Sequence, residues 1–204
     1  MFFPIEAHTM ALALPYSLTL LLLVLSVPYS TTAQTPSYID LGSSLIAADH
    51  DSYWASPSGD FAFGFQEIVK GGYLLAIWFN KIYEKTIVRS ANGNNLAPKE
   101  SVVKFTADGQ FVLHDTTGKE TWKADLVRSG AVASAAMLDN GNFVLANQSS
   151  AYLWQRFNHP TDTILPTNIM NMGGKLVARY AETNYSDGRF QFTLQPDGNL
   201  VLYA

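Results

Sequence analysis

The sequence predicts an all-β fold, and three observations support this prediction. Phe61, Phe63 and Phe65 alternate with small residues, which is typical of a strand with one aromatic face. The run from Tyr73 to Phe79 is continuously apolar and predicts a buried strand. Turn-forming residues recur about every eight to twelve positions, and no stretch has convincing amphipathic helical spacing. Together these features favour a sandwich, a barrel or a prism.

Hairpins account for most of the predicted strands. Gly71-Gly72 is a hairpin turn, and 102–105 pairs with 111–113 across 107–109. In the same way, 134–138 pairs with 143–145 across Asp139-Asn140-Gly141. Further strands are predicted at 85–90, 120–122, 152–154, 175–180 and 189–194. The segment 38–57 is polar and rich in turns, and 157–166, which holds two prolines, is predicted to be an ordered crossing loop.

An internal repeat underlies this pattern. The segments TADGQFVLH (106–114), MLDNGNFVL (137–145) and QPDGNLVLY (195–203) each place an aspartate and a glycine turn before an apolar strand. The aspartates lie 31 and 58 residues apart, so the spacing is close to one or two multiples of thirty. Such repetition predicts one supersecondary unit stacked around an axis, because a single unit cannot bury its own apolar face.

Composition excludes several classes of function. The chain has 204 residues, of which 48% are hydrophobic, and a net charge of −4, which favours neither nucleic acid nor an anionic membrane as a partner. It has no cysteine, so disulfides and thiolate zinc sites are excluded. Its four histidines show no metal-ligand spacing. We therefore expect no metal and no cofactor.

The N-terminal segment predicts a signal peptide at residues 1–33. Residues 9–33 carry no charge, and Leu18 to Val27 is almost entirely leucine and valine. Thr31 and Ala33 suit positions −3 and −1 of signal peptidase, which makes the mature chain begin at residue 34. The usual basic residue is missing before the apolar core, although initiation at Met10 would remove the atypical start. A transmembrane anchor is the rival interpretation, but an apolar core of about ten residues is short for a span. We expect a secreted or cell-surface chain with no membrane span after signal removal.

The segment from Leu194 to Tyr203 carries the main candidate site. In a β-strand, alternate side chains share a face, so Leu200 and Leu202 are predicted to point into a core. The other face would offer amides, a carboxylate, a phenol and an apolar patch, which is what a sugar with hydroxyls and a C–H face requires. The residues of this face are Gln195, Asp197, Asn199, Val201 and Tyr203.

The pattern Q-x-D-x-N-x-V-x-Y resembles the mannose-binding motif of the bulb-type (monocot mannose-binding) lectins. The resemblance implies that Asp197 and Asn199 bind the axial 2-hydroxyl of mannose. It also assigns Gln195 to the 3-hydroxyl, Tyr203 to the 4-hydroxyl and Val201 to the ring carbons. No other ligand is implied.

The resemblance extends over nearly the whole mature chain. SGDFAFGF (58–65), LLAIWF (74–79), SANGNN (90–95) and FNHPTDTILP (157–166) look like the first bulb-type lectin domain of plant G-type lectin S-receptor-like serine/threonine kinases. That family implies a β-prism II fold, in which three four-stranded antiparallel sheets with pseudo-threefold symmetry meet at an axis of apolar residues and tryptophans. It also implies a lectin domain at 34–170 and the incomplete start of a second lectin-like domain at 171–204. In such receptors a membrane helix and a kinase follow.

Arg89 departs from the family pattern. The family usually has tryptophan in the stretch I-V-W-S-A-N, and this chain has arginine there. An unpaired buried charge is costly, so we expect the guanidinium to reach solvent or to find a partner.

The other two repeats are eroded copies of the motif. In the copy at 106–114 the secondary sugar-binding candidates are Asp108, Gln110, Val112 and His114. In the copy at 137–145 an inserted residue places Asn142 out of phase with Asp139. For both copies the main predicted role is a scaffold, formed by a hairpin turn and a core strand. Asn147 and Asn184 each begin an N-x-S sequence and are predicted glycosylation sites.

The sequence indicates a binding protein and not an enzyme. It contains no G-x-S-x-G elbow, no P-loop and no glycine-rich kinase loop. The expected partners are mannose-containing glycans or glycoproteins, with a homo-oligomer or a receptor partner left open and nucleic acid excluded. Two alternatives remain: a lectin-like protein-interaction module, and a truncated receptor-kinase ectodomain without sugar binding.

Overall fold

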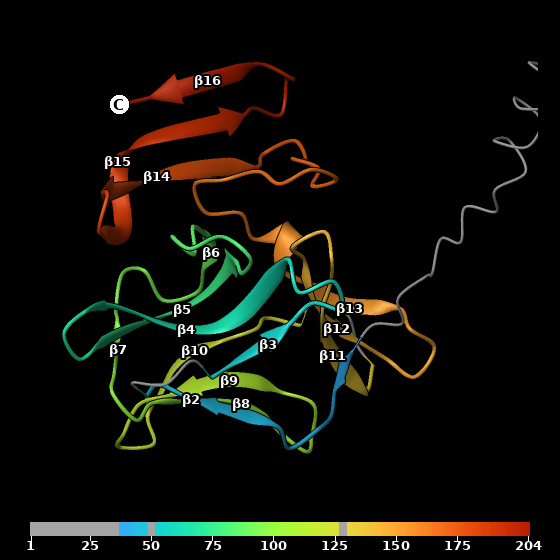
Figure 1. The fold of residues 1–204 in the computed structure, drawn as a ribbon. Helices are drawn as coiled ribbons and strands as arrows, with labels where there is room; N and C mark the ends of the chain where they lie inside the picture. The colour runs from blue at the N-terminus through green and yellow to red at the C-terminus, as the bar shows by residue number, and fades with distance from the viewer. Residues whose placement is uncertain (1–36, 49–51, 127–129) are drawn as a thin grey trace, which may run out of the picture. The chain divides into compact units, whose positions relative to one another are not determined.

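The computed structural model describes residues 37–48, 52–126 and 130–204, and the predicted signal peptide lies outside these ranges. Within them, one short 3-10 helix (Arg156–Asn158) accompanies sixteen strands (Figure 1). The strands are β1 (Tyr38–Ile39), β2 (Ser44–Ile46), β3 (Tyr53–Ala55), β4 (Phe61–Val69), β5 (Gly72–Phe79), β6 (Ile87–Ser90), β7 (Ala97–Pro98), β8 (Val102–Phe105), β9 (Phe111–His114), β10 (Glu120–Lys123), β11 (Ser134–Met137), β12 (Phe143–Ala146), β13 (Tyr152–Gln155), β14 (Lys175–Ala181), β15 (Asn184–Leu194) and β16 (Leu200–Tyr203).

Three antiparallel sheets form a β-prism, which confirms the predicted fold class. Their strand orders are β1-β11-β12-β13, β10-β9-β8-β2 and β3-β4-β5-β6, with β7 also paired to β5. Each sheet is built on the hairpins that the sequence predicted: β4–β5, β8–β9 and β11–β12. The strands β1, β2 and β3 lie in the segment that was predicted as mainly turns. They are two or three residues long and exist because each adds to the edge of a larger sheet.

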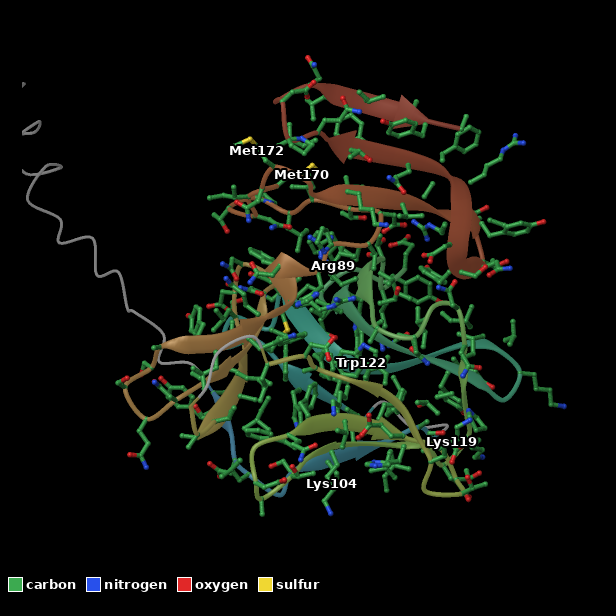
Figure 2. The ribbon with its side chains drawn as sticks, turned by 180° about the vertical axis from the view of Figure 1, so that it is seen from behind. Arg89, Lys104, Lys119, Trp122, Met170 and Met172 are labelled. Atoms are coloured by element: carbon green, nitrogen blue, oxygen red, sulfur yellow. The ribbon has the colours of Figure 1, made fainter. Side chains whose placement is uncertain are left out.

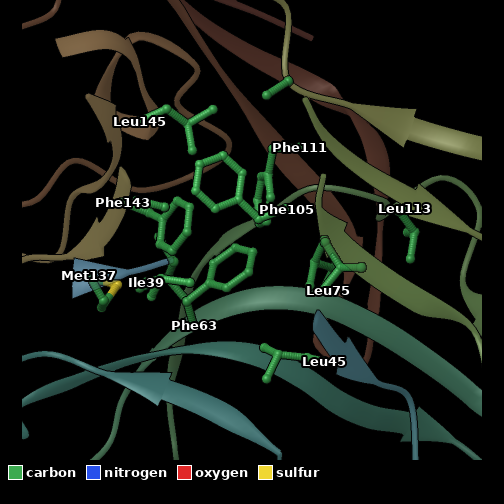
Figure 3. Close-up of a cluster of buried hydrophobic side chains, with 14 of the residues drawn as sticks. Ile39, Leu45, Phe63, Leu75, Phe105, Phe111, Leu113, Met137, Phe143 and Leu145 are labelled. Carbon is green, nitrogen blue, oxygen red and sulfur yellow. The ribbon is translucent and has the colours of Figure 1, made fainter. Parts of the chain in front are cut away.

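The three sheets share one core, to which each contributes a phenylalanine. Phe63 of β4, Phe111 of β9 and Phe143 of β12 meet with ring centroids 4.3–5.6 Å apart (Figure 3). Trp122 and Trp154 pack edge-to-face beside them, at 6.3 Å. Each large side chain buried in this way contributes about 1.5–3 kcal/mol. The repeat therefore serves one physical purpose, which is to bring three apolar faces to a common axis.

The burial of both faces of β5 explains why its sequence is continuously apolar. Leu75 and Ile77 face the axis, whereas Leu74, Ala76 and Trp78 belong to a second buried cluster on the opposite face. Because both faces are covered, no position in the strand is free to be polar.

Strands β14, β15 and β16 form a separate three-stranded sheet. Here one prediction was wrong: Leu200 and Leu202 are 60% and 68% exposed and do not enter a core. Leu202 pairs with Phe192, which is also exposed, so the apolar face of this sheet is uncovered. The alternation of the motif strand is as expected, but alternation sets which side chains share a face and does not supply a partner for that face.

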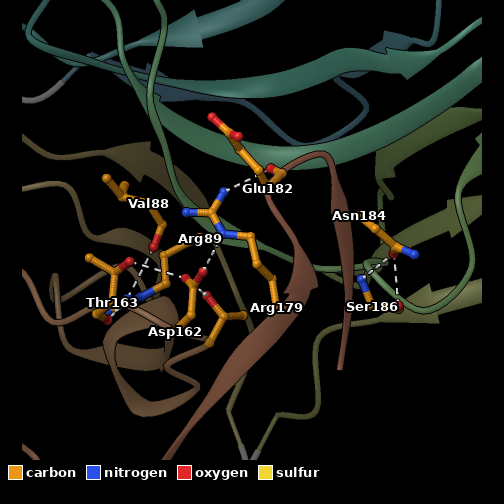
Figure 4. A network of polar contacts seen from close by, with 9 residues as sticks. Val88, Arg89, Asp162, Thr163, Arg179, Glu182, Asn184 and Ser186 are labelled. Carbon is orange, nitrogen blue, oxygen red and sulfur yellow. Dashed lines mark hydrogen bonds and ion pairs between the residues drawn. The ribbon is translucent and has the colours of Figure 1, made fainter. Parts of the chain in front are cut away.

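This sheet is joined to the segments before it by polar contacts. The backbone N–H of Val177 donates to the carbonyl of Thr161, at 2.9 Å. The amide of Asn94 donates to the Asp187 carboxylate, at 2.8 Å, and accepts the backbone N–H of Asp187. An ion pair joins Arg179 Nε to Asp162 Oδ2, at 3.1 Å (Figure 4).

Arg89 lies in the interior, in the middle of β6, where the family pattern has tryptophan (Figure 2). Only 1% of the residue is exposed, so it does not reach solvent. Its guanidinium finds neutral partners instead: the carbonyl oxygens of Val88 and Thr163 and the side-chain oxygen of Asn168.

Candidate functional site

The β15–β16 hairpin positions the five motif side chains. Thr193 pairs with Val201 and Gln191 pairs with Tyr203, which fixes the register of the hairpin. Its turn closes through hydrogen bonds from Gly198 N to the Gln195 carbonyl, at 2.9 Å, and from Gln195 N to the carbonyl of residue 199, at 2.8 Å. Gly198 has a φ of +88°, a conformation that favours glycine.

Within the turn, Asp197 and Asn199 hold each other in place. Asn199 donates to the Asp197 carboxylate twice, from its backbone N–H at 3.1 Å and from its side-chain amide at 2.9 Å. These two bonds, the backbone bond being the stronger influence, lower the pKa of Asp197 below its ordinary value. The carboxylate is therefore ionised and oriented at neutral pH, ready to accept hydrogen bonds from a hydroxyl.

At the other end of the site, Gln195 and Tyr203 form a second pair. The Gln195 amide donates to the Tyr203 hydroxyl oxygen, at 2.6 Å. Val201 lies between Asn199 and Tyr203 in sequence and is half-buried, whereas Asp197, Asn199 and Tyr203 are exposed. The structure thus brings the predicted residues onto one accessible surface, the "motif face", defined by Gln195, Asp197, Asn199, Val201 and Tyr203.

The secondary set at 106–114 has the same turn but a different surface. Gln110 donates to the Asp108 carboxylate, at 2.8 Å, as Asn199 does to Asp197. Bonds from Thr106 and then from Gln110 lower the pKa of Asp108. Val112, however, is only 3% exposed, since it pairs with Lys104 on one side and Lys123 on the other. Long lysine side chains cover apolar surface with their stems, so this valine offers little area to a sugar ring. His114, the fourth candidate, ends β9 and is half-buried.

The third set at 137–145 is used inside the fold. Asp139 accepts the backbone N–H of Ser58, at 2.7 Å, and so supports the turn before β4. Asn142 is 3% exposed; it accepts the N–H of Phe157 and donates to Gln155, both at 3.0 Å. These contacts agree with the expected scaffold role.

Both predicted glycosylation asparagines lie in side-chain-stabilised turns. Asn147 accepts from the backbone N–H and the hydroxyl of Ser149, and Asn184 does the same with Ser186. Asn184 is exposed, whereas Asn147 is partly buried.

Two further properties concern the part of the chain that the structure describes. No group of three or more His, Asp or Glu side chains in it could hold a metal ion. None of its helices has the length and apolarity that crossing a membrane requires.

Comparisons with known proteins show the family to which most of the chain is related. The family described as D-mannose binding lectin matches residues 86–186. G-type lectin S-receptor-like serine/threonine-protein kinase LECRK2 of Oryza sativa subsp. indica is 42% identical over 194 residues, which cover 90% of this chain and 23% of that protein. The corresponding kinase RLK1 of Arabidopsis thaliana is 43% identical over 178 residues, which cover 81% of this chain and 21% of the relative.

Solved lectin structures also match. A monomeric monocot mannose-binding lectin from Gastrodia elata is 18% identical, with a TM-score of 0.46 over 66% of this chain and all of the other. A Marasmius oreades lectin is 19% identical, with a TM-score of 0.44 over 59% of this chain and 90% of the other.

The chain contains a bulb-type mannose-binding lectin domain. Over most of its length it is homologous to the ectodomain of G-type lectin S-receptor-like kinases, and it spans about a quarter of the length of those relatives. The match falls on their lectin region, and no kinase domain is evident in it.

Proposed function

We propose that this chain binds mannose-type glycans through the motif face. The observation that carries the proposal is a pair of side-chain hydrogen bonds, from Asn199 to Asp197 and from Gln195 to Tyr203. These hydrogen bonds orient a carboxylate, two amides and a phenol before a ligand binds, which lowers the entropy cost of binding. Val201 is the apolar residue of the motif face, on which the carbon side of the sugar ring would rest. A shallow, exposed site of this kind supports a Kd of about 1 mM, or ~4 kcal/mol, so tight binding requires several sites at once.

The test is retention of residues 34–204 on a mannose matrix, with a glycan array to define specificity. Asp197→Ala removes the charged acceptor and is expected to abolish retention, because the sugar hydroxyls lose their strongest hydrogen bonds. Asp108→Ala is the matched control, since Asp108 lies in the equivalent turn of the repeat at 106–114 and accepts a side-chain amide, that of Gln110, in a similar way. It is expected to leave retention unchanged.

The opposite pattern, in which Asp108→Ala alone abolishes retention, would move the site to the secondary set. A folded wild-type chain that is retained on no mannose-bearing matrix would overturn the proposal. Circular dichroism and thermal unfolding of each variant establish that it is folded.

A second candidate function, a protein-interaction module, is favoured by the uncovered apolar face of the β14–β16 sheet. Leu200, Leu202 and Phe192 are exposed there. Under this alternative, Leu202→Ser would weaken capture of an extracellular partner while Asp197→Ala would leave it unchanged.

The proposed setting is extracellular. It combines a cleaved signal peptide at 1–33, a lectin domain at 34–170, a partial second lectin-like domain at 171–204 and N-glycans at Asn147 and Asn184. The homology to receptor-kinase ectodomains supports this setting. Whether the chain acts alone or as part of a receptor ectodomain is tested by sequencing its transcript beyond residue 204.

A further inference from the structure

A cavity of about 580 Å³ is lined by residues other than those of the motif face. It is bordered by β6 and the loop after it, by the 3-10 helix with the loop that follows, and by β14 and β15. Its volume is within the range of small-molecule sites, which is about 300–1,000 Å³. The motif face contributes none of its five residues to the lining.

The cavity lining carries an excess of positive charge. Four cationic side chains border it, Arg89, Arg156, Lys175 and Arg179, against the two carboxylates of Asp162 and Asp187. Asp162 is engaged by Arg179, and Asp187 is engaged by Asn94. The four cations therefore exceed the two carboxylates of the lining by two charges, and neither Arg89 nor Arg156 forms an ion pair with a carboxylate among the described residues.

Arg89 and Arg156 are both more than nine-tenths buried, at 1% and 8% exposed. Their recorded hydrogen-bond acceptors are neutral: three oxygens for Arg89, described above, and the Ser90 carbonyl for Arg156. Arg89 Nε has no hydrogen-bond partner among the described residues. A guanidinium has five N–H donors, so this pair has donor capacity left over.

Both groups remain charged at neutral pH. Burial lowers the pKa of Arg89 to about 10, although Asp162 acts in the opposite direction. Burial and then the charge of Arg89 lower the pKa of Arg156 to about 10. Asp162 opposes this effect only at Arg89 and is itself paired with Arg179, so two buried like charges that interact remain costly unless a further anion offsets them.

We propose that this cavity binds an acidic saccharide unit, a sugar that carries a carboxylate or a sulfate, with its oxyanion held by Arg89 and Arg156. Guanidinium groups match the planar geometry of a carboxylate and donate two parallel hydrogen bonds to it. The side-chain amide nitrogen of Asn158 on the lining provides a donor for a sugar hydroxyl. Because the cavity and the motif face share no residue, binding of an acidic sugar in the cavity can be tested independently of mannose binding at the motif face.

The experiment measures binding to the full chain by calorimetry, at constant ionic strength with chloride as background. The probes are D-galacturonate, its uncharged methyl ester, galactose 6-sulfate, galactose and inorganic sulfate. Galacturonate or galactose 6-sulfate is expected to bind, and the stronger of the two identifies the anionic group. The methyl ester and galactose are expected not to bind. Equal binding of inorganic sulfate and both charged sugars would overturn the saccharide assignment, and no binding of any anion would overturn the site itself.

Three variants localise the effect. Arg89→Trp restores the residue of the family pattern, and Arg156→Gln removes the second charge. Each is expected to weaken binding of the charged sugar about tenfold or more, because each removes charged hydrogen bonds. Arg189→Gln is the control, since Arg189 is exposed and lies outside the cavity. Unchanged binding in both Arg89→Trp and Arg156→Gln would contradict the assignment.

A measurement on the wild-type chain covers the case in which a variant does not fold. The side-chain Nε–H resonances of Arg89 and Arg156 are expected to shift on addition of galacturonate and to stay in place on addition of galactose. Shifts confined to exposed arginines would overturn the proposal.

Discussion

At the scale of single residues, polar positions that look alike in the sequence differ in burial and therefore in role. Asn142 and Gln110 both follow the glycine of a repeat hairpin. Asn142 is buried and connects β12 to Gln155 and to the start of the 3-10 helix, whereas Gln110 is exposed and contacts only its own turn. The same place in the repeat therefore carries a structural role in one copy and a surface role in another.

Asn142→Ala is expected to destabilise the fold by about 1–3 kcal/mol, because it leaves the buried N–H of Phe157 without an acceptor. Gln110→Ala is the matched control and is expected to change the free energy of unfolding by less than about 0.5 kcal/mol. Urea unfolding of both variants measures the difference. Equal effects would show that the Asn142 bonds do not stabilise the fold.

We expect the stability of the fold to depend on pH through His159, which stacks on Trp154 with ring centroids 5.5 Å apart. Burial lowers the pKa of His159 below its ordinary value of 6.5, and the charge of Arg156 lowers it further, whereas Asp125 raises it. Between that lowered pKa and 6.5 the unfolded chain binds more protons than the folded one, so stability is full above about 6.5 and is lost as the pH falls.

His159→Gln is therefore expected to flatten the dependence of unfolding free energy on pH between about 7.5 and 5. Urea unfolding at several pH values, for the wild type and the variant, measures the two slopes. Identical slopes would mean that His159 does not carry this effect.

At the scale of elements, the repeated D-x-G or D-G turn places glycine in the left-handed region three times. Gly109, Gly141 and Gly198 have φ values of +83°, +84° and +88°. Their surroundings differ: an added Cβ at Gly198 would meet nothing within 4 Å, whereas at Gly141 it would come within 2.5 Å of Leu165 and 2.9 Å of Phe61. One turn sits at the surface and the other against the core.

Gly141→Ala is expected to cost about 1–2 kcal/mol for the left-handed backbone and about 1–3 kcal/mol more for the clash with the core. Gly118→Ala shares only the first cost, since Gly118 has a φ of +82° and open space around it. Thermal unfolding of the two variants should differ clearly, with Gly141→Ala the less stable. A smaller effect of Gly141→Ala would contradict this packing argument.

At the scale of the whole molecule, the axis core is complete before the last sheet begins. Its buried cluster runs from Ile39 to Leu165 and includes the three central phenylalanines. Thr163 and Asn168, which accept hydrogen bonds from Arg89, also precede β14. β14 and β15 contact the preceding segments through the polar contacts described above and through Tyr185, which packs against the second buried cluster.

A chain of residues 34–170 is therefore expected to unfold in one cooperative transition, with a modest loss of stability from exposing the second cluster near Tyr185. Scanning calorimetry of this chain beside residues 34–204 tests the prediction. A broad, non-cooperative transition would show that the last sheet is part of the folding unit.

The residue pattern by itself determined the all-β class and the main hairpins, because period-two alternation and glycine turns are local properties, whereas the choice of a three-sheet prism came from the resemblance to the bulb-type lectins. The pattern also identified the motif residues that share a face, since strand geometry sets side-chain direction. It could not give the short strands β1 and β3, which depend on pairing with an edge that other segments provide.

Only the tertiary structure decided what covers each face. Phe111 and Leu113 are buried, whereas Leu200 and Leu202 of the corresponding strand are exposed, because burial depends on neighbouring sheets and not on alternation. For the same reason the sequence singled out Arg89 as a departure but gave no sign that Arg156, 67 positions later, would lie beside the same cavity. Contacts between distant segments are set by the way the chain folds back on itself, which no local pattern records.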